Sequence, residues 1–466
     1  MTHSVASFNF GNFSILEQYQ VKKFIQTLKN IWSIEELKNK ILYTLLLVGV
    51  YRIGAHIVLP GINPVILEEH SKSNTQTGIL DLINTFAGGA FNMASIFALG
   101  IMPYITASIF MQLLTVLVPT FQKMQKEGES GRKKITQMTR YITVAVTAVQ
   151  AFAYVTYLRQ TSGPAIMASY PPAMFVLTTV VILTAGSLFI MWLGEKITDK
   201  GLGNGASLII MIGILARFPQ SIAQELTYRS NRTGDILIFI IEIALFIAIN
   251  MGCILLVQGV RKVPVNYAKQ IVGNRQFGGA RQFLPLKVNA SGVMPIIFAQ
   301  AIMFVPTLFT MSNPNAALSK AFTDHTSIWY MLIYSAVVIG FTFLYTALIF
   351  NPKQISDNLK QNNGFIPGVK PGQPTTDYIG TIMDRITFPG AILLALVGIL
   401  PGIIQLIFGM TQGFAMFFGG TSLLINVAVI LDTLQQIETH LMMRQYDGLM
   451  KSGRIQGRQS SSAVQI

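Results

Sequence analysis

Long apolar runs alternate with short polar segments along the whole chain. Ten of the runs have about 20 residues each, which is the length a helix needs to cross a hydrocarbon core of about 30 Å. The pattern therefore predicts a helical protein that crosses a membrane ten times. The predicted spans are residues 40–59, 93–118, 141–158, 173–194, 204–222, 237–257, 291–310, 329–350, 387–408 and 418–440.

The apolar stretch between Asp81 and Lys123 is too long for a single span. It has 41 residues without a charge, and one helix of that length would be about 60 Å long. We therefore expect two pieces with a break at Gly88 and Gly89. The first, residues 77–87, would be a short amphipathic half-helix, and the second a full span that starts at Met93.

The composition supports an integral membrane protein. Of the 466 residues, 51% are hydrophobic and 12% are charged, with a mean hydropathy of +0.51, whereas a soluble domain carries about 25% charged residues. Residues 1–32 contain Glu17 and three lysines and no long apolar core, so we expect no cleavable signal peptide.

Catalytic and metal-binding motifs are missing from the sequence. A single cysteine, Cys253, excludes an intramolecular disulfide, and the five histidines lack the spacing of metal ligands. There is no HExxH, G-x-S-x-G or P-loop motif, and the GxG at residues 201–203 opens a span, where a turn or a close helix approach explains it better than a nucleotide. We expect no enzyme activity, no catalytic residues, no metal and no cofactor.

The basic residues alternate between the predicted connections. With a cytoplasmic N-terminus, the inside segments hold 27 of the 34 lysines and arginines and the outside segments hold 6, while Arg52 lies in the first span. These counts assign Lys40, at the start of the first span, to the inside and Arg217, near the end of the fifth, to the outside. This bias fits the positive-inside rule with both termini in the cytoplasm. The net charge of +14 then reflects topology and attraction to anionic lipids.

Three inside segments are unusual in length or charge. Residues 259–287 carry six basic residues and no acidic one, residues 351–385 are longer still, and residues 123–140 contain the dense basic turn KEGESGRKK. Connections of this length are often functional. They are either docking surfaces for a large cytoplasmic partner or solvated loops that only set topology.

Few ionisable residues lie within the spans. Three that stand out are Arg52, Glu242 and Asp432, and structural pairing is one reading of each, although Glu242 is near enough to a span end to reach the outer interface. The uncharged Gln112, Gln150 and Asn289 either bond helices together or line a seam that can separate. A transporter or pump would place more ionisable groups at mid-membrane.

Eight short motifs resemble the SecY family, the pore subunits of the bacterial protein-conducting channel, in register from about residue 32 to 446. They are ASIFALGIMPYI at 94–105, KEGESGRKK at 126–134, LGE at 193–195, GNG at 203–205, VNYAK at 265–269, LPLKVN at 284–289, FNP at 350–352 and GGTSLL at 419–424.

The resemblance implies an all-α membrane protein of ten transmembrane helices in two inverted, pseudo-symmetric five-helix halves with a half-helix plug. Residues 1–38 would be a cytoplasmic tail and residues 39–222 the first half, with the plug at about 77–93. Residues 223–441 would be the second half, with docking loops 259–287 and 351–385, and residues 442–466 a second cytoplasmic tail.

The implied function is the central channel subunit of a Sec translocon. Unfolded secretory polypeptides would cross the bacterial inner membrane through it, and membrane segments would leave sideways through a lateral gate of spans 2, 3, 7 and 8. Implied partners are SecE-like and SecG-like small subunits, the SecA ATPase or the ribosome, the secretory polypeptide and anionic lipids. The alternatives are a secondary transporter built on broken helices and a receptor that uses the basic loops alone.

The resemblance also assigns site residues, and a ring of aliphatic side chains could close to a dewetted throat. The sets are a pore ring of Ile101, Ile105, Ile210, Ile297, Ala301 and Ile425; a plug with Leu80, Leu82, Ile83, Phe86, Gly88 and Gly89; a lateral gate with Gln112, Gln150 and Asn289; and docking residues Arg261, Lys262, Lys269, Arg275, Lys353 and Lys370.

Two positions depart from the family pattern. Lys370 stands where the family usually has arginine, so a bidentate contact is lost there. Glu242 has no expected counterpart.

Overall fold

Every apolar range overlaps a helix in the computed structural model of this chain. The ten helices concerned are α2 (Glu35–Gly54), α5 (Met102–Leu117), α7 (Glu129–Thr161), α8 (Pro172–Lys200), α9 (Gly205–Ser230), α10 (Ile236–Gln258), α11 (Met294–Thr310), α13 (Ile328–Ile349), α15 (Gln373–Phe408) and α17 (Gly420–Lys451).

The described part of the chain covers most of these elements. It comprises residues 32, 34–67, 84–161, 163–167, 171–231, 235–267, 270–272, 275–277, 281–310 and 326–451. Leu80, Leu82 and Ile83 of the expected plug and Lys269 of the expected docking set lie outside it.

Seven of the described helices are long and apolar enough to cross a membrane. α5 and the short α6 (Pro119–Lys126) could together make an eighth span, with a bend of 100° between them. α11 has 17 residues and α2 carries Lys38, Lys40 and Arg52, so these two are short or charged for a span. The chain is thus a multi-span helical protein, and the count of ten spans stays a prediction.

Some predicted boundaries were wrong. The second span was expected from Met93, but α5 begins at Met102, because turns occupy residues 87–101 and Pro103 favours a helix start there. The expected basic turn at 123–140 is largely helical: only Glu127 and Gly128 form a turn between α6 and α7.

The expected docking loop 351–385 also contains more regular structure than predicted. Asn351 caps α14 (Pro352–Gln361) by accepting a hydrogen bond from the Gln354 N–H at 3.2 Å. α15 already begins at Gln373, ahead of the predicted span start at residue 387.

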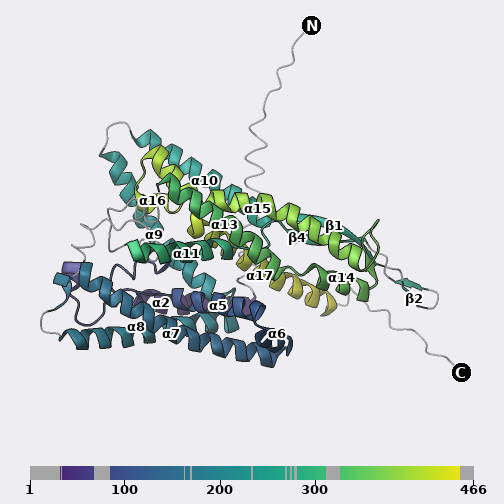
Figure 1. Cartoon of the computed structure of the whole chain (residues 1–466), viewed down its shortest axis with the longest axis horizontal. Coiled ribbons are helices and arrows are strands. Elements are labelled where there is room, and N and C mark those ends of the chain that lie inside the picture. The colour runs from purple at the N-terminus through teal and green to yellow at the C-terminus, as the bar shows by residue number, and fades with distance from the viewer. Residues whose placement is uncertain are drawn as a thin grey trace, which may run out of the picture.

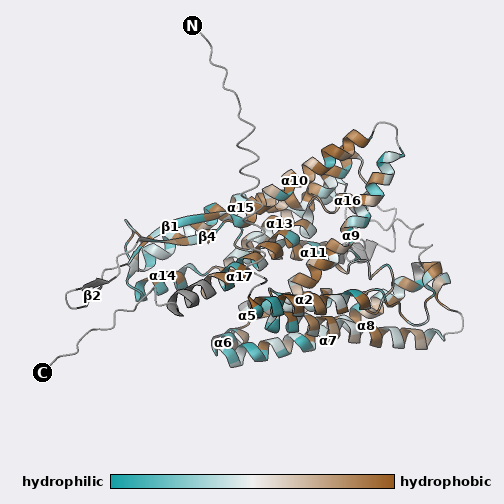
Figure 2. Cartoon of the chain, turned by 180° about the vertical axis from the view of Figure 1, so that it is seen from behind, coloured by the Kyte–Doolittle hydropathy of each residue, from teal (hydrophilic) through white to brown (hydrophobic). Residues whose placement is uncertain are grey.

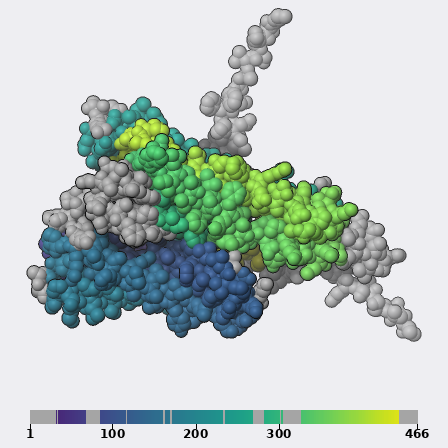
Figure 3. Space-filling model, viewed as in Figure 1, coloured from purple at the N-terminus to yellow at the C-terminus, as the bar shows by residue number. Residues whose placement is uncertain are grey.

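The helices form two layers (Figure 1). α2, α5, α7 and α8 make the first layer, and α10, α11, α13 and α15 the second. The space-filling view shows the same division as a blue and a green body (Figure 3). α9 and α17 lie between the layers and pack against each other, so they connect the two.

A small antiparallel sheet projects at one end, which the sequence reading did not predict. Its order is β4–β1–β5, from β4 (Arg281–Lys287), β1 (Val260–Tyr267) and β5 (Gly364–Phe365). Val263, Val265 and Leu286 turn inward onto α14 and α15. β2 (Gln270–Val272) and β3 (Arg275–Phe277) form a separate hairpin between β1 and β4.

Hydrophilic residues gather at that same end. Figure 2 shows teal segments on α14, β1 and β4 and on α6, and a further teal part on α9 at the opposite end, while most of the helix bodies are brown and pale. The long polar connections of the sequence therefore share one side of the bundle.

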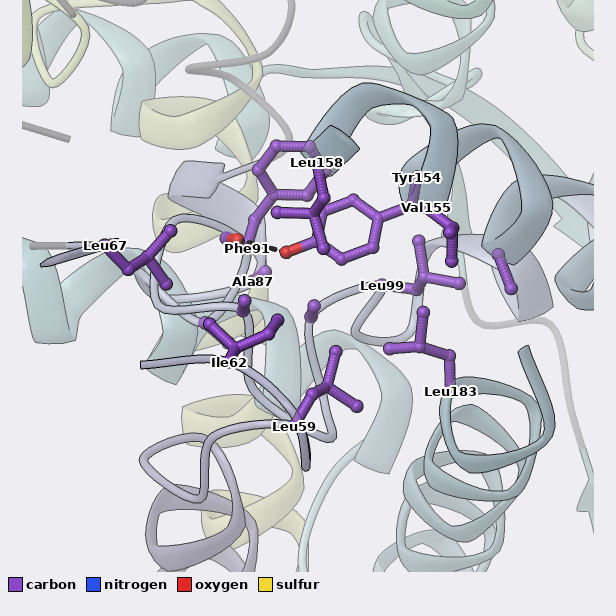
Figure 4. Packing of buried hydrophobic residues seen from close by; sticks show 14 of the residues in the cluster. Leu59, Ile62, Leu67, Ala87, Phe91, Leu99, Tyr154, Val155, Leu158 and Leu183 are labelled. Carbon is purple, nitrogen blue, oxygen red and sulfur yellow. Dashed lines mark hydrogen bonds between the residues drawn. The ribbon is translucent and has the colours of Figure 1, made fainter. Parts of the chain in front are cut away.

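The core of the first layer holds the turns between α2 and α5 in place. Ala87, Phe91 and Leu99 of the turns pack against Leu158 of α7 and Leu183 of α8, as Figure 4 shows. The hydroxyl of Tyr154 donates to the Phe91 carbonyl oxygen at 2.6 Å. The non-helical segment is thus packed inside the bundle.

Because α8 approaches the turns closely, we expect a larger side chain at Gly186 to destabilise the protein. A Cβ on Gly186 would lie 2.2 Å from the Ile96 carbonyl oxygen, whereas a Cβ on Gly340 of α13 meets nothing within 4 Å. We expect overpacking by Gly186→Ala to lower the free energy of unfolding by about 1–3 kcal/mol. The thermal unfolding temperature of the purified protein in detergent should therefore fall. Gly340→Ala, the matched control, should leave it unchanged or raise it. Equal temperatures for both variants would contradict the packing.

Candidate functional site

A cavity of about 640 Å³ lies between the two layers. It is lined by residues of α5, α7, α8, α9, α11 and α17 and of the turn before α11. Four of the predicted pore-ring residues line it, namely Ile105, Ile210, Ile297 and Ile425. The sequence placed these residues on four different helices, and the fold brings them to one cavity.

The isoleucines pack together at one end of this cavity. Ile101, Ile210 and Ile425 are buried in one hydrophobic cluster, and Ile105 and Ile297 pack against it. We call this cluster the isoleucine constriction. Ala301 lies on α11, one turn beyond Ile297. Aliphatic side chains from α5, α9, α11 and α17 therefore meet where the layers meet.

The turn segment, residues 84–101, reaches the constriction. Phe86 belongs to the same buried cluster as Ile101 and Ile210. Its carbonyl oxygen would be only 2.5 Å from a Cβ on Gly213 of α9, so the segment packs directly on that helix. Gly88 and Gly89 have φ of +65° and +90°, conformations that favour glycine.

Two arginines and a tyrosine hold the turn segment. Nη1 of Arg52 donates to the Gly88 carbonyl oxygen at 3.3 Å, and Nη1 of Arg217 donates to Thr85 Oγ1 at 3.1 Å. The Tyr51 hydroxyl donates to the Ala87 carbonyl oxygen at 3.4 Å. Arg52 is therefore bonded to the protein itself, which agrees with the structural pairing that was one of its readings from sequence.

The predicted lateral-gate residues are only partly brought together. Gln112 of α5 accepts a hydrogen bond from the Tyr345 hydroxyl of α13 at 2.7 Å. Beside it, Ile109, Phe298 and Tyr345 form a small cluster that joins α5, α11 and α13, which we call the seam. Asn289 is buried before α11 and accepts from Ser291 Oγ at 3.2 Å, and Gln150 is half-buried on α7. Among the described side chains, no hydrogen bond joins Gln112 to either.

The other end of the cavity is polar. Arg140 of α7 makes a two-pronged ion pair with Glu195 of α8, from Nε at 2.9 Å and from Nη2 at 2.7 Å. Asp199 and Asp432 also line the wall. Because α8 ends at Lys200 and α9 begins at Gly205, this polar mouth faces the side of the bundle that carries the basic connections.

The predicted docking residues lie at that side. Arg261 and Lys262 are exposed on β1, Lys353 is exposed on α14, and Lys370 is exposed between β5 and α15. β1 pairs with β5, so the two connections form one surface. Arg275 lies in β3.

Glu242 does not reach the interface, which was one of its predicted positions. Its side chain is 0% exposed, and its Oε1 lies 2.7 Å from Nη2 of Arg229. The other reading, structural pairing, is the one the structure shows.

Sequence reasoning missed Arg217, Tyr345 and the Arg140–Glu195 pair. Arg217 is a charged residue within an apolar range, and Tyr345 places a hydroxyl within the eighth span. Both could have been recognised from the sequence as polar groups that need a partner. The Arg140–Glu195 pair is separated by 55 residues, and only packing brings the two together.

Comparison with known proteins gives one answer. A sequence model described as SecY matches residues 95–434. The chain is 40% identical over 437 residues to "Protein translocase subunit SecY" of Streptomyces scabiei, covering 89% of this chain and 97% of the relative. It is 40% identical over 441 residues to the protein of the same name from Thermotoga maritima, covering 93% and 99%.

Solved structures share the fold. "The structure of a protein conducting channel" superposes with a TM-score of 0.60 at 16% identity, covering 91% of this chain and 95% of that one. "Sec61 in the Canine ribosome-channel complex from the endoplasmic reticulum" gives 0.55 at 15% identity, with the same coverage.

The hydrogen bond at the seam makes a prediction for a double-mutant cycle. Gln112→Leu, Tyr345→Phe and the double variant should show a coupling of about 0.5–1.5 kcal/mol in the free energy of unfolding, because each single change removes the same bond. A second cycle of Gln150→Leu with Tyr345→Phe serves as control and should be additive. Additivity in the first cycle would contradict a bond across the seam.

Proposed function

The chain belongs to the SecY family, and we propose that it is the central subunit of a Sec translocon whose pore is closed at the isoleucine constriction. The family's members are protein translocase subunits, and this chain is a channel subunit of that kind. Unfolded secretory polypeptide would enter at the polar mouth of the 640 Å³ cavity and pass through the constriction.

One observation carries the proposal. Ile101 just before α5, Ile210 of α9 and Ile425 of α17 meet in one buried cluster at the end of a cavity that is polar at its other end. Such side chains offer a passing polypeptide no fixed hydrogen bonds, and they can exclude water when closed. The six proposed ring residues are those named from sequence, including Ala301.

The proposed plug is the one named from sequence, about residues 77–93, of which the turn segment contains residues 84–93. Phe86 belongs to the constriction cluster, and Tyr51, Arg52 and Arg217 donate hydrogen bonds to Ala87, Gly88 and Thr85 of the segment. The bonds from Tyr51 and Arg52 are long, at 3.4 and 3.3 Å, while those from Arg217 to Thr85 and from Tyr154 to the Phe91 carbonyl oxygen are shorter, at 3.1 and 2.6 Å. Each hydrogen bond is worth about 1 kcal/mol. The segment can therefore be held when the channel rests and released when a polypeptide enters.

The seam is the proposed lateral gate. It rests on one cluster of three buried side chains and one hydrogen bond between α5 and α13. Parting it would open the cavity toward lipid and release membrane segments sideways.

The proposed partners follow from the charge and the family. The surface of β1, β5 and α14 would bind the SecA ATPase or the ribosome, and SecE-like and SecG-like subunits would flank the helices. One related solved structure is titled as a Sec61 channel in a ribosome complex. We place the chain in the bacterial inner membrane, with both termini and the basic surface in the cytoplasm, where the inside excess of lysine and arginine puts them.

Changing the constriction should make the resting channel leak. We expect Ile101→Ser with Ile105→Ser to raise resting ion conductance in planar bilayers at least tenfold, because two hydroxyls let water wet the throat. The control is Ile236→Ser with Ile240→Ser, at the same spacing on α10 and 57% and 63% exposed. Equal conductance in the ring variant, the control and the parent would overturn the ring assignment.

Reversing charge on the docking surface should weaken partner binding. Arg261→Glu with Lys370→Glu should lower the affinity of SecA for reconstituted vesicles about 30-fold at low salt, at about 1 kcal/mol for each contact. The effect should shrink at high salt. Lys200→Glu, exposed at the end of α8, is the control. If the double variant binds SecA as tightly as the parent protein does, the docking assignment is wrong and these charges only set the membrane topology.

A further inference from the structure

Two phenylalanines extend the isoleucine constriction. Phe417, in the turn before α17, is 5% exposed and belongs to the same buried cluster as Ile210 and Ile425. Phe218 of α9 packs against that cluster. The ring centroids of Phe218 and Phe417 are 5.1 Å apart, with the planes at 59°, an arrangement in which aromatic rings attract each other. Neither residue was assigned a role from sequence.

Both rings lie on the side of the isoleucines away from the polar mouth. α9 begins at that mouth, and Phe218 lies eight residues beyond Ile210, which is about 12 Å of helix. On α17 the order runs against the chain direction. Asp432 lines the mouth, Ile425 lies in the constriction, and Phe417 precedes the helix.

The turn segment reaches the same level of the pore. Gly213 lies between Ile210 and Phe218 on α9, and a Cβ there would be 2.5 Å from the Phe86 carbonyl oxygen. Phe86 also belongs to the buried cluster that contains Phe417. Phenylalanines from three separate segments therefore gather beyond the isoleucines. We call Phe218 and Phe417 the aromatic collar.

The collar is part of a larger array of aromatic rings in the second layer. Phe218 stacks with Phe246 of α10 at a centroid distance of 5.4 Å. Phe246 meets Phe418 edge-on at 5.4 Å, and Phe418 meets Phe414 edge-on at 5.1 Å. Side chains packed this closely are held in fixed positions. The collar is thus anchored to the second layer.

Phe417 stands on irregular backbone between two helices. α15 ends at Phe408, and Gly409 follows with φ of +60°. The short α16 (Gln412–Ala415) then leads to the turn that carries Phe417. Figure 1 shows α16 beside α9 and α10, at the end of the bundle opposite α14 and β1. The N–H of Phe417 donates to the Phe414 carbonyl oxygen at 3.0 Å, so the position of the Phe417 ring depends on where α16 lies.

A buried ion pair on α9 binds both ends of the connection from α15 to α16. Arg229 donates from Nη2 to the Phe408 carbonyl oxygen at 2.6 Å, which satisfies an acceptor at the end of α15. Glu225 Oε2 accepts from the Thr411 N–H at 2.8 Å and from the Thr411 hydroxyl, just before α16. Arg229 Nε and Glu225 Oε1 are 2.9 Å apart, and the two side chains are 3% and 0% exposed. Breaking such a pair leaves an unpaired charge out of water, so the connection is firmly held.

We propose that the aromatic collar is a second closure of the pore, on the side of the isoleucine constriction away from the polar mouth, and that Glu225 and Arg229 position Phe417 in it. The inference rests on the proposed channel function and names further residues of the same pore. Apolar rings exclude water from a narrow passage as the isoleucines do. The isoleucines and the collar form one dry passage, and wetting either part lowers the barrier to ions.

Serine replacements test the collar. Phe218→Ser with Phe417→Ser should raise resting ion conductance in planar bilayers about fivefold, because the hydroxyls let water wet that part of the passage. Phe218→Leu with Phe417→Leu loses the rings but stays apolar, and it should conduct as the parent does. Phe175→Ser, at a 1% exposed position of α8 in the first-layer cluster, controls for a hydroxyl placed elsewhere in the core. Where the double serine variant does not fold, Phe417→Ser against Phe417→Leu gives the same comparison.

The ring variant, Ile101→Ser with Ile105→Ser, is measured beside the collar variants. A leak from the ring variant without one from the collar variant would overturn the collar and leave the proposed pore intact. A leak from neither would overturn the constriction, and the collar with it. Equal leaks from the serine and leucine collar variants would show that lost packing opens the pore, and would overturn the collar as an apolar closure.

A second pair of variants tests the positioning role of Glu225. Arg229 also pairs with Glu242 of α10 at 2.7 Å, and among the described residues Glu242 bonds to Arg229 alone. Glu225→Gln should raise resting conductance about threefold, because an amide holds Thr411 and Arg229 less strongly than a carboxylate does. Glu242→Gln, the matched control, removes an equally buried carboxylate that does not touch the connection, and it should conduct as the parent does.

A combined variant shows whether Glu225 acts through Phe417. If it does, adding Glu225→Gln to Phe417→Ser should raise the leak no further, because the two changes disturb the same contact. A purely structural effect of Glu225 would add to that of Phe417. A further rise in the combined variant, an equal leak from Glu242→Gln, or no leak from Glu225→Gln would each overturn the positioning role.

Discussion

Non-helical backbone inside an apolar bundle is the constraint on which this structure depends. Lipid offers no hydrogen-bond partner, so irregular backbone at membrane depth must be satisfied within the protein. The turn segment meets this condition largely by itself: the N–H of Gly89 reaches the Asn84 carbonyl oxygen at 2.8 Å, and that of Ser95 reaches Ala90 at 3.1 Å. The Ile96 N–H bonds outside the segment, to the Ile57 carbonyl oxygen at 2.9 Å.

The same constraint explains the arginines within the helices. A charge in a low-dielectric interior must be paired or bonded. Arg52 and Arg217 bind oxygens of the turn segment, and Arg229 binds the carboxylates of Glu225, Glu242 and Asp235 and the carbonyl oxygen of Phe408 at a helix end. Arg52 and Arg217 bind the turn segment at 3.3 and 3.1 Å, whereas Arg229 joins α9, α10 and the end of α15 through contacts of 2.6 to 2.9 Å. The molecule thus combines a lightly held turn segment with a firmly held junction between its layers.

Much of the architecture could be predicted from sequence because the length of an apolar run is a local property of the chain. The apolar ranges correspond to helices, and the motif register pointed to Ile101, Ile210 and Ile425, which one buried cluster contains. The small sheet was missed because the inward residues of β1 and β4, such as Val263 and Leu286, become a pattern only once the strands pair. The start of α5 was missed because composition alone does not distinguish an apolar turn from an apolar helix.

The sequence by itself determined that the chain is a multi-span membrane protein with its basic residues on one side, because span length and charge bias are read residue by residue. It also determined the family, through motifs that are local in the chain. Only the tertiary structure decided that the turn segment lies against Gly213, that Gln112 meets Tyr345, and that Glu242 pairs with Arg229. These contacts join residues that are far apart in the chain or on different helices, and their geometry exists only after the helices have packed.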